Sequence, residues 1–186
     1  MTPQEVYDRA LADPDCDMKE YLGFMRHFAR GNILEIGVRY GVSTSAFLLG
    51  IEKNGGHLYS VDIDLECGKL FNRPEWTFLC ADSQSPRALD GPDWNDARGF
   101  DLILIDGDHK PEAVRHDLRQ FAPLLRRNGM LLVHDVIPQP NITPEMEAQN
   151  WPTAAVGEEF ARFAKESGWL NFIIAGKFGM GVLIRE

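Results

Sequence analysis

Ionisable side chains stand directly behind two apolar runs of the sequence. The run LILI is followed by Asp106 and, three residues on, by His109, and the run MLLV is followed by His134 and Asp135. Each apolar run predicts a buried strand, so these side chains stand where strands end. Carboxylate oxygens together with a histidine nitrogen form a mixed ligand set that suits a divalent cation such as Mg²⁺, Mn²⁺ or Fe²⁺. The pattern therefore supports the hypothesis of a metal site.

The same residues also have a purely structural interpretation. In it, Asp106 and Asp135 cap helices, and His134 is a satisfied polar group. The intrinsic pKa of histidine lies near neutrality, which suits His109 to the removal of a proton from a substrate. Asp108 competes with His109, either as a base or metal ligand or as the residue that fixes the turn around it. These alternatives stay open at the level of the sequence.

A glycine-rich turn follows the first apolar run, in the segment LEIGVRYGVSTS. Glu35, Gly37 and Gly41 give it the spacing acid-x-Gly-x-x-x-Gly, and a helix is predicted to follow. Glycines let the backbone approach a ligand closely, and the start of a helix offers free N–H donors. The spacing differs from the dinucleotide fingerprint Gly-x-Gly-x-x-Gly, and an acid there would repel a pyrophosphate. A cofactor with a carboxylate, an amine and a ribose suits this turn better, although tight packing alone also explains it.

Two further strand ends carry acids. Asp62 follows the second run, where doubly wound nucleotide-binding proteins commonly place an acid that accepts hydrogen bonds from ribose hydroxyls. Asp64, two residues later, is predicted to cap a helix that begins near Leu65. Asp82 and Ser83 follow the third run, where they either bind the edge of an adenine or close a turn.

The elements that must position these residues alternate along the chain between strands and helices. The predicted strands cover 32–37, 57–63, 76–81, 101–106, 129–136, 170–177 and 179–186. The predicted helices cover 18–30, 42–53, 110–127 and 154–167. This alternation predicts an α/β fold with a doubly wound, seven-stranded, mostly parallel sheet, in which the last two strands form an antiparallel hairpin at one edge.

Composition limits the function classes. A chain of 186 residues with 44% hydrophobic content predicts one domain, and a net charge of −9 argues against a nucleic-acid surface. The sequence shows no basic and apolar leader and no run long enough to span a membrane, which predicts a cytoplasmic protein without a membrane partner. The three cysteines are too scattered for a zinc site or a disulfide framework. A small-molecule partner is expected.

Two segments outside the predicted sheet have open roles. Residues 136–153 are rich in proline and have no clear period, which predicts a lid or an acceptor-binding loop. Trp151 in this segment either shields the site from water or packs in the core. Residues 1–30 are predicted to form a helical cap, and the segment 18–30 either covers the cofactor or mediates a homo-oligomer.

The chain of motifs resembles the class I S-adenosylmethionine-dependent methyltransferases, whose fold has a Rossmann-like sheet. Within that class, IDGDH with the later HDV is similar to the small O-methyltransferases of the family-24 type, which are akin to catechol and macrolide-sugar O-methyltransferases. The resemblance implies a metal-assisted transfer of a methyl group from S-adenosylmethionine to a hydroxyl of a small molecule. Two alternatives stay open: a metal-independent N- or O-methyltransferase, and a non-catalytic protein that binds S-adenosylmethionine.

The resemblance also implies roles for individual residues. Cofactor contacts fall to residues after the first three predicted strands, namely Glu35, Gly37, Gly41, Ser43, Asp62, Asp82 and Ser83. By this resemblance, Glu35, Gly37 and Gly41 line the methionine part of the cofactor, and Ser43 starts the helix. Asp62 holds the ribose, and Asp82 and Ser83 face the adenine. The implied metal ligands are Asp106, His134 and Asp135, and the implied base is His109. His134 stands where the related families usually carry an acid, which leaves the identity of the metal open.

Overall fold

Seven strands form one mixed sheet in the structure, a computed structural model that describes residues 1–85, 99–138, 141, 143–148 and 154–186. The strands are β1 (Gly31–Ile36), β2 (Gly56–Asp62), β3 (Trp76–Cys80), β4 (Phe100–Ile105), β5 (Leu125–His134), β6 (Leu170–Ile174) and β7 (Met180–Ile184). Their order across the sheet is β3-β2-β1-β4-β5-β7-β6, and only β7 runs antiparallel to its neighbours. The predicted doubly wound sheet with an antiparallel hairpin at one edge is confirmed.

The order of the strands reverses between β1 and β4, which lie side by side although β2 and β3 separate them in the chain. In open α/β sheets, ligands bind beyond the carboxyl ends of the strands at such a point. The residues that follow β1, β2, β4 and β5 are therefore the ones that the topology offers to a ligand.

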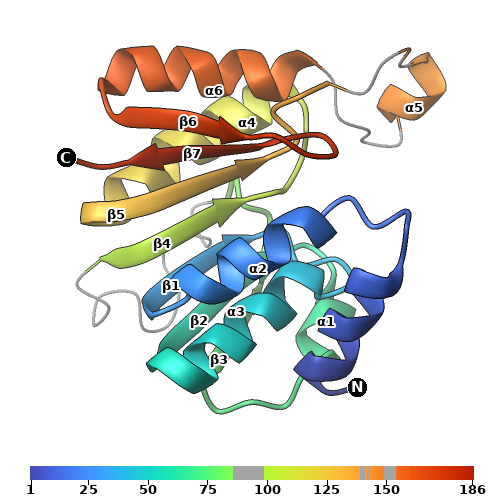
Figure 1. Cartoon of the computed structure of the whole chain (residues 1–186). Coiled ribbons are helices and arrows are strands. Elements are labelled where there is room, and N and C mark those ends of the chain that lie inside the picture. Colours follow the sequence, from blue (N-terminus) through green and yellow to red (C-terminus); the bar gives the residue numbers. More distant parts are fainter. Residues whose placement is uncertain (86–98, 139–140, 142, 149–153) are drawn as a thin grey trace.

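Helices cover both faces of the sheet (Figure 1). They are α1 (Pro3–Ala12), α2 (Lys19–Phe28), α3 (Val42–Asn54), α4 (Pro111–Phe121), α5 (Pro144–Ala148) and α6 (Ala154–Ser167), with short 3₁₀ helices η1 (Leu65–Lys69) and η3 (Ala122–Leu124). Among the residues described, no helix is long and apolar enough to cross a membrane.

Each face of the sheet has its own hydrophobic core. Residues Leu102 and Leu104 of β4 pack into the core that α1, α2 and α3 cover, while Ile103 and Ile105 pack into the core that α4 and α6 cover. Successive side chains of a strand point to opposite faces, so a strand covered on both faces is apolar throughout. This explains why the predicted strands lack polar alternation.

The N-terminal segment predicted as a helical cap contains α1 and α2, which pack against α3. A capping box starts α1, in which Thr2 Oγ1 accepts from the backbone N–H of Glu5, and the Glu5 carboxylate accepts from the backbone N–H of Thr2. Such reciprocal hydrogen bonds satisfy donors that the first turn of a helix leaves free. Local hydrogen bonding therefore defines the start of this cap.

The helix predicted over 110–127 is wrong at its carboxyl end. The α-helix ends at Phe121, η3 follows, and β5 begins at Leu125. Pro123 has no N–H to donate to the preceding turn, so the α-helix cannot continue through it. Arg126 lies in β5 instead, where its guanidinium donates to the carboxylate of Asp101 at 2.6 and 2.8 Å.

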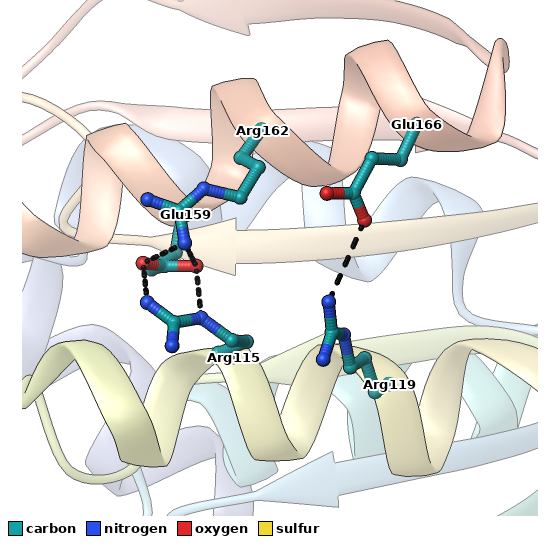
Figure 2. Close-up of polar contacts among 5 residues, drawn as sticks. All are labelled: Arg115, Arg119, Glu159, Arg162 and Glu166. Atoms are coloured by element: carbon teal, nitrogen blue, oxygen red, sulfur yellow. Dashed lines mark hydrogen bonds and ion pairs between the residues drawn. The ribbon is translucent and has the colours of Figure 1, made fainter.

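A buried carboxylate joins α4 to α6 (Figure 2). Glu159 of α6 is 3% exposed, and Arg115 of α4 donates to both of its oxygens at 2.6 and 3.0 Å. Arg162 of α6 lies 3.0 Å from the same carboxylate. These hydrogen bonds, led by those from Arg115, hold the pKa of Glu159 below its usual range. The pair fixes α6 on the face of the sheet that α4 covers.

We expect Glu159→Gln to lower the free energy of unfolding by about 1 to 3 kcal/mol, because the buried bidentate pair with Arg115 loses the charge of its carboxylate. Arg115 and Arg162 are partly exposed, so water compensates part of the loss. Urea unfolding at neutral pH measures the loss. Glu166→Gln is the matched control, since Glu166 is about half exposed and lies 3.8 Å from Arg119. Its expected loss is below about 0.5 kcal/mol, and equal losses in the two variants would contradict the interpretation.

Candidate active site

Two carboxylates and one imidazole meet at the carboxyl ends of β4 and β5. Asp106 follows β4, and His134 is the last residue of β5, directly before Asp135. His134 Nδ1 lies 3.2 Å from Asp106 Oδ1 and 3.2 Å from Asp135 Oδ1. One ligand atom from each residue lies within 4.8 Å of the others, so the three form a group that could hold a metal ion. The structure thus brings together the predicted metal ligands.

Burial controls the charges of this group. Desolvation lowers the pKa of His134, but the carboxylates of Asp106 and Asp135 outweigh it and raise that pKa to about 9. Burial raises the pKa of Asp135, against the effect of the two histidines beside it. Without a cation, the imidazolium of His134 therefore balances the carboxylates.

Two features of Asp135 fit a cation. Its Oδ1 atom is buried and has no hydrogen-bond partner, although His134 Nδ1 lies 3.2 Å away. Its backbone adopts φ 63°, a left-handed conformation that is uncommon outside glycine and is often found at functional sites. A divalent ion would satisfy this oxygen and replace the charge of the imidazolium.

His109 contacts the same group from the loop before α4. Its Nε2 atom lies 3.0 Å from Asp135 Oδ2, and its side chain is 13% exposed. A carboxylate in this position orients the imidazole ring of His109. The predicted base therefore lies beside the predicted metal ligands.

A cavity of about 310 Å³ opens over these residues. Its wall contains Asp106, His109, His134 and Asp135, together with Ser43 at the start of α3. The segment before α2 contributes Asp17 and Met18, and the loop after β1 contributes Tyr40. Tyr40 belongs to the glycine-rich turn that the sequence indicated. No pattern in the sequence placed Asp17 and Met18 at the cavity, because their approach depends on how the N-terminal helices pack on α3.

A second cavity of about 470 Å³ lies over the ends of β1, β2, β3 and β4. Asp62, Asp82 and Ser83 line it, as predicted for a cofactor site. Gly37 and Asp106 belong to the walls of both cavities. The two cavities therefore adjoin, and together they form a cleft that runs along the carboxyl edge of the sheet.

Asp62 is held by the backbone. Its Oδ2 atom accepts from the N–H groups of Val38 and Arg39 at 2.7 and 3.0 Å, and its Oδ1 atom accepts from Asp64 at 2.9 Å. Burial raises the pKa of Asp62, but these N–H donors outweigh it and hold the pKa below its usual range. These backbone donors fix the orientation of the carboxylate at the wall of the larger cavity.

Glu35 lies behind the cleft, among its supporting residues. It is fully buried, and its oxygens accept from the hydroxyls of Ser43, Thr44 and Ser60 at 2.6 to 2.9 Å. Burial raises the pKa of Glu35 to about 7, although the three hydroxyls oppose the shift. Its hydrogen bond positions Ser43, which does line the cleft, while direct contact of Glu35 with a cofactor stays a prediction.

Both predicted glycines occupy backbone conformations that side chains rarely adopt. Gly37 has φ 91°, and a Cβ atom there would collide with the backbone of Asp106. Gly41 has φ 74° at the cap of α3, and a Cβ atom would lie 2.9 Å from the ring of Phe71. Gly37 thus lets the ends of β1 and β4 approach closely, which forms the floor of the cleft.

The remaining predicted acids close turns. Asp64 caps η1 by accepting from the N–H of Glu66 at 2.9 Å, which confirms the prediction. Asp82 Oδ1 accepts from the N–H of Gln84 at 2.9 Å, and Asp108 Oδ1 accepts from the N–H of Lys110 at 3.1 Å. Asp108 lines the larger cavity and lies outside the group that could hold a metal. Trp151 lies outside the described residues.

A further acid, which the sequence interpretation missed, lies under the cleft. Asp117 of α4 is 1% exposed, and neither of its carboxylate oxygens has a hydrogen-bond partner. It faces Gly107 on the floor of the cleft, since a Cβ atom on Gly107 would lie 3.5 Å from Asp117 Oδ2. A helical projection could have shown it, because Asp117 lies on the apolar stripe that Val114 and Phe121 define.

A family model described as a methyltransferase domain matches residues 34–136, which cover β1 to β5 and the cleft. No curated protein sequence matches the chain significantly.

Solved structures with the same fold cover nearly the whole chain. The S-adenosylhomocysteine-bound methyltransferase PaMTH1 of Podospora anserina is 17% identical, with a TM-score of 0.71 over 99% of this chain and 87% of that one. A candidate caffeoyl-CoA O-methyltransferase of Staphylococcus aureus is 13% identical, with a TM-score of 0.72 over 100% and 93%. MycE, a methyltransferase of mycinamycin biosynthesis with bound Mg, S-adenosylhomocysteine and mycinamycin VI, is 16% identical, with a TM-score of 0.64 over 99% and 54%.

We expect Asp117→Asn to flatten the pH dependence of stability. Burial raises the pKa of Asp117 from 3.8 to about 6, so the folded protein keeps this proton while the unfolded chain has lost it. The wild type then loses on the order of 2 to 3 kcal/mol from this group as the pH rises from about 4 to about 8, and the loss is complete above the folded pKa.

Urea unfolding of both proteins at the two pH values measures this difference. Near pH 4 the carboxyl of Asp117 is neutral in the folded wild type. The difference in the free energy of unfolding between the two proteins at that pH therefore gives the effect of replacing a neutral carboxyl by an amide, which does not depend on pH. An equal change of stability with pH in the wild type and in Asp117→Asn would show that Asp117 is not the buried group that titrates.

Proposed function

This chain belongs to the methyltransferase-domain family, and on that premise we propose that it is a metal-assisted O-methyltransferase that acts on a hydroxyl of a small molecule. One observation carries the proposal: Asp106, His134 and Asp135 converge with His109 at one end of the cleft. The bound Mg and mycinamycin VI of MycE support the same combination of metal and small acceptor.

The larger cavity is proposed to hold S-adenosylmethionine. Asp62 lines this cavity and is proposed to accept from a ribose hydroxyl, and Asp82 with Ser83 lies where the adenine would extend. Gly37 and Ser43 lie toward the smaller cavity, where the methionine part would lie. This arrangement directs the reactive methyl group toward His109 and the metal-binding residues.

The metal proposal depends on the donor set. Asp106 and Asp135 supply carboxylate oxygens and His134 supplies a ring nitrogen, which suits Mg²⁺, Mn²⁺ or Fe²⁺. When bound, such an ion lowers the pKa of a hydroxyl whose oxygen it coordinates. Because the ion needs neutral His134, its binding releases the proton that the two carboxylates hold on that ring.

The chain's own residues supply the rest of the reaction. The acceptor oxygen forms a bond to the methyl carbon, the bond from that carbon to sulfur breaks, and S-adenosylhomocysteine leaves. His109 takes the proton from the acceptor hydroxyl, and Asp135 at 3.0 Å stabilises the imidazolium that forms. Asp17, Met18 and Tyr40 form the opposite wall of the cavity and limit the space for the acceptor.

We expect the metal-stripped protein with S-adenosylhomocysteine to bind Mg²⁺ or Mn²⁺ at one site. Asp106→Ala and Asp135→Ala each remove a ligand oxygen, so calorimetry should show no saturable binding in either variant. Asp108→Ala is the matched control, because Asp108 lies in the same loop but outside the group, and it should bind the metal within about twofold of the wild type. Cofactor binding without metal uptake by the wild type would refute the metal proposal.

We also expect methyl transfer to a phenol or sugar hydroxyl from a panel of small acceptors, detected as S-adenosylhomocysteine and a methyl ether by mass spectrometry. His109→Ala should lower kcat by about 100-fold or more, because it removes the base. Its affinity for S-adenosylhomocysteine should stay within about twofold of the wild type.

The same assay separates the alternatives. Activity that persists in a chelator would indicate a metal-independent methyltransferase. A protein that binds the cofactor but turns over no acceptor in the panel would indicate a binding protein without catalysis. Unchanged kcat in His109→Ala would exclude His109 as the base.

A further inference from the structure

A third cavity, of about 630 Å³, lies away from the cleft and has a basic wall. It opens between the carboxyl-terminal ends of α2 and α3, which lie side by side on one face of the sheet (Figure 1). Arg26, His27 and Arg30 approach from α2 and the residues after it, and Lys53 approaches from α3. Among the residues that the structure describes, no acid lines this cavity, although the chain has 28 acids against 19 lysines and arginines.

These cations are not neutralised by the protein. Within the described part of the chain, Arg26, Arg30 and Lys53 form no ion pair with a carboxylate, whereas arginines elsewhere, such as Arg73 and Arg115, do. The guanidinium of Arg26 lies over the ring of Tyr7 at 5.2 Å, which holds it in place by a cation–π interaction. Counted over the described residues, the cavity therefore has an excess of positive charge, which a bound anion would balance.

The wall of the cavity is rigid. Asn54 at the end of α3 donates from its side chain to the backbone oxygen of Ala29 after α2, at 3.0 Å. Gly50 of α3 packs against the backbone of Arg26 with no room for a side chain. The two helix ends that carry the basic residues are thus fixed to each other, so binding would require little ordering of the backbone.

Gly23 leaves space that the protein itself does not use. A Cβ atom at Gly23 would meet nothing within 4 Å, and α2 has no positive φ there. Glycine inside a helix costs about 1 kcal/mol relative to alanine, so neither packing nor backbone conformation explains it. An open surface at this position is what a bound ligand needs.

We propose that this cavity binds a small anion that carries phosphate groups. Arginine guanidinium groups recognise phosphate oxygens through paired hydrogen bonds, and a lysine ammonium adds a further charge. The volume lies within the usual range for a small-molecule site, about 300 to 1,000 Å³. The site is separate from the cleft, because it adjoins the amino ends of β1 and β2, roughly 20 Å along the strands from their carboxyl ends.

The cluster of basic residues also has a simpler explanation, because basic side chains at the carboxyl end of a helix balance the partial negative charge of that end. Arg26 and His27 in α2 and Lys53 in α3 do lie in last turns. That explanation covers neither Arg30, which lies beyond α2, nor the open surface at Gly23. It predicts no saturable binding of an anion, so an experiment distinguishes it from the proposal.

The test is calorimetric titration of inorganic triphosphate into the full chain at about 0.15 M ionic strength, with the cleft filled by S-adenosylhomocysteine and no added metal. We expect one saturable site in the wild type. The double variant Arg30→Gln with Lys53→Gln should bind at least tenfold more weakly, and Gly23→Glu should bind no triphosphate, since it adds a carboxylate to the cavity. Arg119→Gln is the matched control, because Arg119 is an exposed arginine of α4 outside this cavity, and its affinity is expected within twofold of the wild type.

Absence of saturable binding to the wild type, or equal binding by the double variant, would overturn the proposal. Tighter binding of a single-stranded oligonucleotide than of triphosphate would overturn it in favour of a nucleic-acid surface. Thermal unfolding shows that each variant is folded, and the affinity for S-adenosylhomocysteine should be unchanged in all of them. The outcome is therefore independent of the proposed methyl transfer.

Discussion

A carboxylate that is buried at the end of a sheet needs a positive charge or hydrogen-bond donors beside it, or else it keeps its proton, and the active-site end of this protein is arranged around that constraint. Asp135 is almost completely buried, and removing a carboxylate from water costs several kcal/mol unless it is paired. The imidazolium of His134 supplies the charge when no cation is present, with its pKa raised to about 9. In the proposed metal complex, a divalent ion would take the place of this charge between the same carboxylates.

Glu35 on β1 meets the same constraint in a different way. Glu35 is as deeply buried as His134, but no cation lies beside it, and three hydroxyls donate to its oxygens instead. Neutral donors compensate a charge less well than a cation does, and burial accordingly raises the pKa of Glu35 to about 7. Asp117 of α4 is also buried, and burial raises its pKa to about 6.

Much of this arrangement could be predicted from the sequence because it depends on strand ends. Asp62, Asp106 and Asp135 each follow an apolar run, and parallel strands bring their carboxyl ends to one edge, so the sequence positions alone indicate a shared site. Asp17 and Met18 could not be predicted, because they reach the cleft only through the packing of α1 and α2 on α3. The end of α4 was misjudged because charge and apolar spacing continue past Pro123, where the backbone can no longer be helical.

The two ends of the sheet select ligands of opposite charge. Asp62, Asp82, Asp106 and Asp108 line the larger cavity of the cleft, where only Arg39 and Lys110 oppose them. Such a wall favours a positively charged sulfonium or a metal ion and disfavours a free phosphate, because like charges in a cleft repel. A phosphate-bearing anion is attracted instead to the basic cavity at the amino ends of β1 and β2. The net charge of −9 is a sum over the whole chain and includes both regions. It therefore argues against a broad basic surface, but it could not reveal a small basic cavity.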